Sequence, residues 1–310
     1  MPLLIRRSLV AFALVCLAGT AVAPAAFGQA ADATKVPAPV DVTIDTKDGV
    51  RLVATYLASV KGKDAPTIIC LHMFKGNRRD MLALGTRLQK EGCAVILPDL
   101  RGHGESTTVI LNGVEKKFDA ATMPPAQFPN MVTQDMEAVK KFLIGENNAG
   151  KLNIERLGIV AAEMSVQIAV KWTVMDWAWP VLPTLKQGQD VKAIVMLSPT
   201  MSFKTLNMSQ EVQSPQSPIR EKISLLLICG AEDRASLTDS RRIQQMLARF
   251  RPTPEKIEDK TLFIDDTFKT KLVGTKLLGE ASLGVDELIA QFVELRLAAP
   301  SYPWKDRTTP

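Results

Sequence analysis

The sequence predicts an α/β fold: a mostly parallel central sheet with helices on both faces and an antiparallel hairpin at its N-terminal end. From Thr67 onward, short continuous apolar runs alternate with helical stretches. This is the pattern of strands that crossover helices bury on both faces. Residues 40–58 instead form two alternating runs around Asp48-Gly49, and Asp-Gly is a strong hairpin signal. Roughly 280 residues can bury a substantial core within one domain, which we place at residues 40–298.

The expected elements alternate along the chain, which implies right-handed crossovers between parallel strands. Strands are expected at residues 67–72, 94–99, 156–161, 192–198, 224–230 and 261–266. Helices are expected near residues 79–91, 130–143, 163–172, 238–248 and 285–297. Ligands bind such sheets at the carboxyl ends of the strands, so functional residues are expected in the loops that follow the strands.

The N-terminal residues 1–30 are expected to be a secretory signal peptide. Arg6-Arg7 precede an apolar run and a small-residue stretch that ends at Ala30, as in exported proteins. The run is shorter than the roughly 20 residues that span a bilayer. We therefore expect export to the periplasm or the extracellular space, without a membrane anchor afterwards. Residues 31–39 are expected to be a flexible linker, and residues 299–310 a C-terminal tail.

Composition excludes several classes of function. Without the expected signal, 36 basic residues stand against 33 acidic ones, and the chain lacks the basic stripe that nucleic-acid binding usually needs. Cys70, Cys93 and Cys229 each lie in an apolar run and are expected to be core residues without a disulfide. We expect no metal or other cofactor, and the oligomeric state is left open.

Two motifs resemble the α/β-hydrolase family, and the resemblance covers roughly residues 40–298. "IICLHMFKGNRRDM" is similar to the strand and loop whose backbone amides help to form the oxyanion hole, and it contains His72, Met73 and Phe74. "GCAVILPDLRGHGES" is similar to the family's Asp-x-Arg-Gly-x-Gly-x-Ser turn. The resemblance implies that polar side chains hold this turn together without a chemical role. Its residues are Asp99, Arg101, Gly102, His103, Gly104 and Ser106.

The catalytic triad that the resemblance implies is incomplete. The nucleophile elbow, Gly-x-Ser-x-Gly in the family, falls on "GIVAAEMSVQIA" and has Glu163 in place of serine. The acid is present as Asp233 in "ICGAEDRA", but "FIDDTFKTKLVG" offers Phe268 where the histidine is expected. The chain's two histidines both belong to the upstream motifs. A Ser-His-Asp mechanism needs all three groups, so two of its roles are vacant.

Glu163 admits several interpretations. It could be a nucleophile, since the resembling haloalkane dehalogenases and epoxide hydrolases have an aspartate at the elbow. It could share acid and base roles with Asp233, or bind a divalent cation with it. Alternatively, it is a carboxylate that the positive end of a helix keeps charged, a contribution of about 0.3 to 1 kcal/mol. In that case Lys269 or Lys271 could occupy the place of the missing histidine and pair with both Glu163 and Asp233. The former catalytic site would then be filled by an ion network.

The surroundings of this site are less specific. Met73, Phe74 and Met164 are expected to line the mouth of the pocket or else to fill the core. The Trp-rich stretch at residues 171–190 is expected to be an irregular excursion that packs its indoles on the domain. Residues 104–128 and 201–218 are long connections that could wall a pocket.

Taken together, these features predict an exported pseudo-hydrolase. Because the serine and the histidine are replaced, it is expected to bind an unidentified small molecule or partner in the retained cleft without catalysis. The Trp-rich stretch and residues 201–218 are expected to form the walls of this cleft. The alternative is a hydrolase of esters, lactones or epoxides that uses Glu163 as an acid, base or nucleophile.

Overall fold

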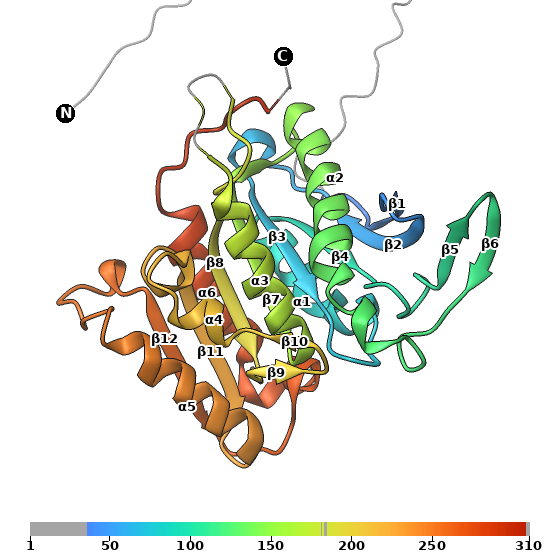
Figure 1. The fold of residues 1–310 in the computed structure, drawn as a ribbon. Coiled ribbons are helices and arrows are strands. Elements are labelled where there is room, and N and C mark those ends of the chain that lie inside the picture. Colours follow the sequence, from blue (N-terminus) through green and yellow to red (C-terminus); the bar gives the residue numbers. More distant parts are fainter. Residues whose placement is uncertain (1–35, 181, 183–184, 308–310) are drawn as a thin grey trace, which may run out of the picture. The chain divides into compact units, whose positions relative to one another are not determined.

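The computed structural model describes residues 36–180, 182 and 185–307 (Figure 1). The expected signal peptide, most of the expected linker and the last three residues lie outside this part of the chain.

The centre of the fold is a parallel sheet of six strands in the order β12-β11-β8-β7-β3-β4 (Figure 1). Each strand coincides with one of the predicted apolar runs, and their burial explains why the runs are continuous. The strands are β3 (Pro66–Leu71), β4 (Ala94–Pro98), β7 (Asn153–Ala162), β8 (Val191–Leu197), β11 (Ser224–Gly230) and β12 (Leu262–Phe268).

The predicted hairpin is present as β1 (Val40–Asp45) and β2 (Val50–Leu57). Strand β2 extends the sheet by antiparallel pairing with β4. Beyond it lies a second hairpin that we did not predict, β5 (Thr108–Leu111) and β6 (Val114–Lys117). Its turn is Asn112-Gly113, with φ of 51° and 78°. Asn-Gly between apolar residues is a strong hairpin signal, so interpreting this stretch only as a long connection was wrong.

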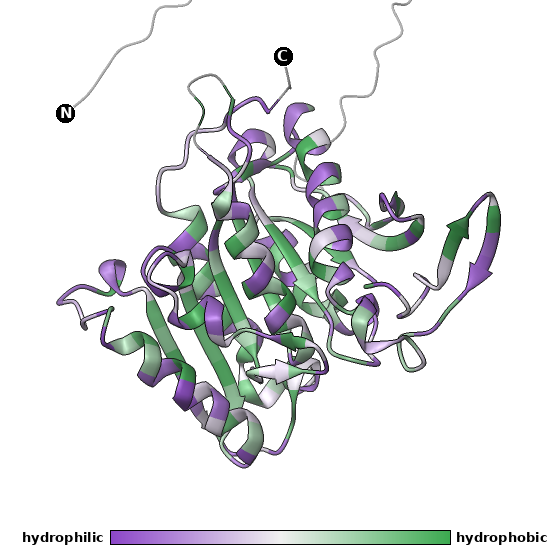
Figure 2. Cartoon of the chain, viewed as in Figure 1, coloured by the Kyte–Doolittle hydropathy of each residue, from purple (hydrophilic) through white to green (hydrophobic). Residues whose placement is uncertain are grey.

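Helices cover both faces of the sheet, and alternate side chains of each strand supply the two cores. Ile69 and Leu71 of β3 face the core beneath α2, α3 and α5, while Ile68 and Cys70 face the core beneath α1 and α6. Figure 2 shows apolar strands in the middle and polar residues along the outer side of α5. The helices are α1 (Leu82–Lys90), α2 (Met136–Asn148), α3 (Met164–Ala178), α4 (Ser209–Gln213), α5 (Arg234–Ala248) and α6 (Val285–Val293).

The Trp-rich stretch differs from its prediction. Helix α3 continues through Trp172 and Trp177 instead of ending near Trp172. Trp172 is fully buried, and its indole N–H donates to Glu137 at 2.7 Å. A helix that is apolar on all sides fits a buried position, and Pro180 follows just after the helix ends.

The C-terminal segment docks on the domain. Asn153 Nδ2 donates to the Tyr302 carbonyl, and Asn147 Nδ2 to the Lys305 carbonyl, both at 2.9 Å. The Arg307 guanidinium reaches Asp190 at 2.7 Å and Glu155 at 2.9 Å. The tail composition resembles that of a loop, but these contacts fix residues 302–307 against the N-terminal ends of the strands.

The three cysteines are buried and free, and burial raises the pKa of the Cys93 thiol to about 12. Within the described residues, none of the helices has the length and apolarity that a membrane span requires.

Candidate functional site

Glu163 occupies a strained turn between β7 and α3. Its φ and ψ are 51° and −114°, a conformation that costs a non-glycine residue about 1 to 3 kcal/mol and clusters at functional sites. The Glu163 amide donates to the Leu197 carbonyl of the neighbouring strand at 2.9 Å. The structure therefore places a glutamate in the geometry expected of the nucleophile elbow.

Ser165 is not an alternative nucleophile at this turn. It is fully buried in the first turn of α3, and its hydroxyl donates to the backbone carbonyl of His72. This bond ties the elbow to the loop after β3, so the hydroxyl is a structural group.

The cost of ionising Glu163 differs from the expectation. The side chain is half-buried and caps none of the amides in the first turn of α3. Burial raises the pKa of the carboxyl, and the nearby Asp233 raises this pKa further, while a hydrogen bond from the Phe74 amide opposes both effects. The expectation that the helix keeps this group charged at little cost was therefore wrong, because burial outweighs the Phe74 hydrogen bond and the side chain does not cap its own helix.

Asp233 lies where the triad acid is expected, at the start of α5. Its Oδ1 accepts a hydrogen bond from the Ser236 amide at 3.4 Å. Its Oδ2 is shielded from solvent and has no hydrogen-bond partner among the described residues. The Asp233 carboxyl thus lies near that of Glu163, and no cation in the described part of the chain forms a salt bridge with either group.

The expected ion network is absent from the described part of the chain. Lys269 and Lys271 are exposed, and no salt bridge there involves them, Glu163 or Asp233. No group of three metal-ligating side chains occurs among the residues that the structure describes either.

The segment that should carry the histidine lies beside the acid loop. The Ala231 amide donates to the Phe268 carbonyl at 2.7 Å, and the Glu232 amide to the Thr270 carbonyl at 3.1 Å. Phe268 itself packs against the core on the α1 and α6 side.

Gly274 of this segment packs closely against the elbow, a contact that the sequence analysis did not predict. A Cβ atom at Gly274 would lie 3.0 Å from Met73 Sδ and 3.6 Å from Ala162 Cβ. Its φ of 58° and this close approach both require glycine. The only signal in the sequence was a glycine after an apolar run.

Both histidines are held as neutral structural groups. His72 is fully buried; its Nδ1 donates to the Met73 carbonyl at 2.8 Å, and its Nε2 accepts from the Leu100 amide at 3.1 Å. Burial lowers the pKa of His72, and it lowers the pKa of His103 to about 4. The His103 ring lies 4.9 Å from that of His72 and bonds through Nδ1 to the Arg101 carbonyl. Both nitrogens of His72 are occupied, so it has none left to act as a base.

The turn after β4 is a hydrogen-bonded unit, in line with the structural role that we expected. Asp99 accepts from the Glu105 amide at 2.9 Å, and Ser106 Oγ donates to the Asp99 carbonyl at 2.7 Å. Arg101 pairs with the buried Asp135 at 2.6 Å. Gly102 and Gly104 have φ of 75° and 52°, and a Cβ at Gly104 would lie 2.2 Å from Asp99 Oδ2.

The apolar residues around the elbow divide between core and surface. Met164 is fully buried in the core, so it does not line a pocket mouth. Met73 and Phe74 are half-buried. The Phe74 ring lies 4.9 Å from that of Phe203 and 6.2 Å from that of Phe128, so aromatic rings pack together above the Phe74 loop.

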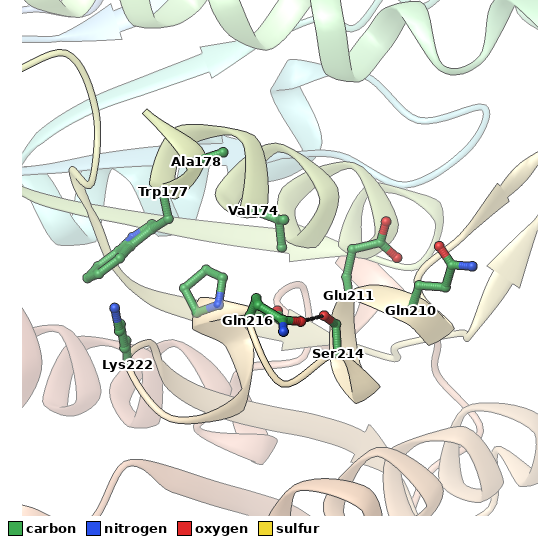
Figure 3. Close-up of a pocket in the computed structure, with 10 residues that line it drawn as sticks. Val174, Trp177, Ala178, Gln210, Glu211, Ser214, Gln216 and Lys222 are labelled. Carbon is green, nitrogen blue, oxygen red and sulfur yellow. Dashed lines mark hydrogen bonds between the residues drawn. The ribbon is translucent and has the colours of Figure 1, made fainter. Parts of the chain in front are cut away.

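A pocket of about 400 Å³ forms between the two segments that we expected to wall a cleft (Figure 3). Val174, Trp177 and Ala178 of α3 form one side, and residues between Gln210 and Pro218 form the other. Trp177 lies fourteen residues into a helix that starts at the elbow, about 20 Å away. The two expected walls therefore form a pocket together, but it lies near the amino ends of the parallel strands, whereas Glu163 lies at their carboxyl ends.

Replacing Glu163 by glutamine is expected to stabilise the protein at neutral pH. The pKa of this carboxyl is raised above its unfolded value of 4.5, so the folded protein binds its proton more tightly than the unfolded chain does. Ionisation therefore removes stability as the pH rises through the folded pKa. Thermal unfolding should show a higher Tm for Glu163→Gln at pH 7 and a much smaller difference at pH 4.

Glu232→Gln, which changes an exposed glutamate beside Asp233, is the matched control and should leave Tm unchanged at both pH values. A Tm gain for Glu163→Gln that is equal at pH 4 and pH 7 would show that ionisation is not its cause.

No protein-family model and no curated protein sequence matches the chain. An esterase from Pyrococcus furiosus superposes with a TM-score of 0.55 at 16% identity, over 84% of this chain and 92% of the esterase. A Pyrococcus horikoshii acylaminoacyl peptidase gives 0.56 at 18% identity, over 87% of this chain and 43% of the peptidase.

A dienelactone hydrolase from Anabaena variabilis gives a TM-score of 0.50 at 14% identity, over 85% of this chain and all of the hydrolase. At such identities the likeness concerns the arrangement of the backbone. Together with the strand order and the elbow between β7 and α3, it shows that the chain has the α/β-hydrolase fold.

Proposed function

We propose that this protein is a hydrolase-like binding protein that does not hydrolyse esters by the Ser-His-Asp route. The observation that supports this most strongly is the combination at the elbow. Glu163 has the strained backbone conformation expected of the nucleophile, but neither histidine of the chain is available as its base. Its ligand would be a small molecule or a partner segment at the carboxyl edge of the sheet.

Ester hydrolysis by this fold requires a base that first activates the nucleophile and then activates water. His72 is committed to two backbone groups, and burial keeps His103 neutral with a pKa of about 4. The Phe268 segment supplies apolar side chains and lysines where the base would stand. An alkyl ester on Glu163, formed when the carboxylate opens an epoxide, would therefore have no base to release it.

One observation favours a second candidate function, a hydrolase of esters, lactones or epoxides. The pKa of Glu163 is raised by burial and by Asp233, and a carboxyl group with a raised pKa is suited to donate a proton. In this alternative Glu163 is the general acid and Asp233 the general base.

Export to the periplasm or the extracellular space is part of the proposal. It rests on residues 1–30, which resemble a secretory signal. Fractionation into culture medium, osmotic-shock fluid and cytoplasm, with a cytoplasmic marker as control, tests the location of the mature chain.

The functional test is turnover of short-chain nitrophenyl esters, lactones and epoxides by the purified mature chain, Glu163→Gln and Glu163→Ser. We expect all three proteins to match the buffer rate, because even a restored serine lacks a base. Turnover by the unmodified chain that disappears in Glu163→Gln would establish the second candidate instead.

A further inference from the structure

We propose that three phenylalanine rings beside the elbow bind a methylated ammonium group, and that Lys204 is a tethered occupant of the same position. We call Phe74, Phe128 and Phe203 the aromatic cluster. This inference deepens the proposed ligand binding by naming a ligand class, and it rests on that proposal.

The aromatic cluster brings together loops that follow three strands. Phe74 follows β3, Phe128 precedes α2, and Phe203 belongs to the short strand β9 (Ser202–Phe203) that follows β8. The Phe203 ring lies 4.9 Å from Phe74 and 5.8 Å from Phe128, in tilted arrangements. The carboxyl edge of the sheet is where this fold binds ligands.

A cation already lies against these rings. Lys204 Nζ is 4.2 Å from the centroid of Phe128, 4.8 Å from Phe74 and 5.7 Å from Phe203. These distances fall within the range of cation–π attraction. Lys75 Nζ also approaches the Phe74 ring, at 5.9 Å. The aromatic cluster is thus placed to attract positive charge.

The turn that carries Lys204 holds the ammonium in place without an ion pair. Lys204 lies between β9 and β10 (Leu206–Asn207) with a φ of 50°, and Thr205 Oγ1 donates to the Pro125 carbonyl at 2.7 Å. Lys204 takes part in no salt bridge within the described residues, and it is exposed. Its side chain can therefore leave the rings for water without breaking another contact.

Two carboxyl groups lie beside the loop that carries Phe74. The Phe74 amide hydrogen-bonds to Glu163, whose carboxyl is also next to Asp233. Neither carboxylate has a cationic partner in the described part of the chain. A ligand cation on the aromatic cluster would sit in their field, which favours a positively charged ligand over a neutral one.

The chemistry of the cation distinguishes a methylated ammonium from the lysine. A primary ammonium is strongly hydrated, so Lys204 gains little by leaving water. A quaternary ammonium is the group that aromatic cages recognise. The ligand should displace Lys204 because both use the same ring faces.

The experiment is isothermal titration of choline and of its neutral isostere 3,3-dimethyl-1-butanol into the mature chain and Lys204→Ala. Choline is expected to bind Lys204→Ala about tenfold more tightly than the unmodified chain, because the tethered competitor is gone. The neutral isostere should bind both proteins at least about tenfold more weakly than choline binds Lys204→Ala.

Three further variants sharpen the comparison. Lys204→Arg keeps a cation on the rings and should bind choline no better than the unmodified chain. Lys75→Ala removes the more distant ammonium and should change choline affinity by less than about twofold. Phe203→Leu in the Lys204→Ala background keeps apolar volume but loses an aromatic ring face. Its affinity for choline should therefore be lower than that of Lys204→Ala.

Equal binding of choline and the isostere, or no gain in Lys204→Ala at an unchanged Tm, would overturn this inference. Neither result bears on the proposed absence of hydrolysis, which is judged by comparing ester turnover of the unmodified chain with that of Glu163→Gln. Conversely, ester turnover would contradict the proposed function whatever choline does.

Discussion

Arg307→Ala is expected to lower the free energy of unfolding by about 3 to 5 kcal/mol, the cost of removing one partner from a buried ion pair. The Arg307 side chain is 1% exposed, and its partners Asp190 and Glu155 are 0% and 8% exposed. Its guanidinium bridges the two carboxylates at 2.7 and 2.9 Å. The substitution leaves buried negative charge with fewer partners.

Urea unfolding of Arg307→Ala beside the unmodified chain measures this effect. Lys305→Ala is the matched control, because its side chain is exposed and only its backbone carbonyl accepts the bond from Asn147; its unfolding midpoint should stay unchanged. Equal stability of Arg307→Ala and Lys305→Ala would mean that the C-terminal segment is not docked in solution.

Arg78→Ala is the second substitution with a large expected effect, again about 3 to 5 kcal/mol. The Arg78 side chain is 3% exposed and lies 2.5 Å from Asp99, which is fully buried. Its backbone amide also donates to Asp99 at 2.6 Å. Arg78 thus joins the loop after β3 to the turn after β4, and its loss leaves Asp99 without a cation.

Arg79→Ala provides a neighbouring control. Arg79 shares the partner Glu105 with Arg78, but its side chain is 74% exposed, and exposed ion pairs contribute about 0 to 1 kcal/mol. Urea unfolding should therefore separate the two variants clearly. Similar losses in both would show that the charge of Glu105, and not the burial of Asp99, governs the stability of this turn.

The sheet was predictable from the sequence because burial on both faces leaves continuous apolar runs. All six parallel strands coincide with such runs, and Asp48-Gly49 marked the first hairpin. The second hairpin was predictable as well, from Asn112-Gly113, but was overlooked. The length of α3 was underestimated because an apolar helix lacks the polar face that usually marks helical periodicity.

The candidate site was predictable in its residues but not in its electrostatics. The motif order located Glu163 and Asp233 at one edge of the sheet, where burial, and to a lesser extent the nearby Asp233, raises the pKa of Glu163. The direction of that pKa shift depends on burial and on the hydrogen bond from the Phe74 amide. Both arise from packing between distant segments, which the local sequence pattern does not reveal. The approach of Gly274 to Met73 and the packing of Lys204 on the aromatic cluster are likewise contacts between distant segments.

Covalent capture at Glu163 tests the central claim most directly. If Glu163 were a nucleophile, the missing base would make its ester intermediate accumulate, so intact-mass spectrometry would detect chemistry that turnover assays miss. The unmodified chain and Glu163→Gln are incubated with an epoxide, which a carboxylate would open to give an alkyl ester, and modified residues are located by peptide mapping. Our account predicts no modification of Glu163 and identical masses for corresponding species of the two proteins, apart from the substitution itself. A stoichiometric adduct on Glu163, absent from Glu163→Gln, would contradict it.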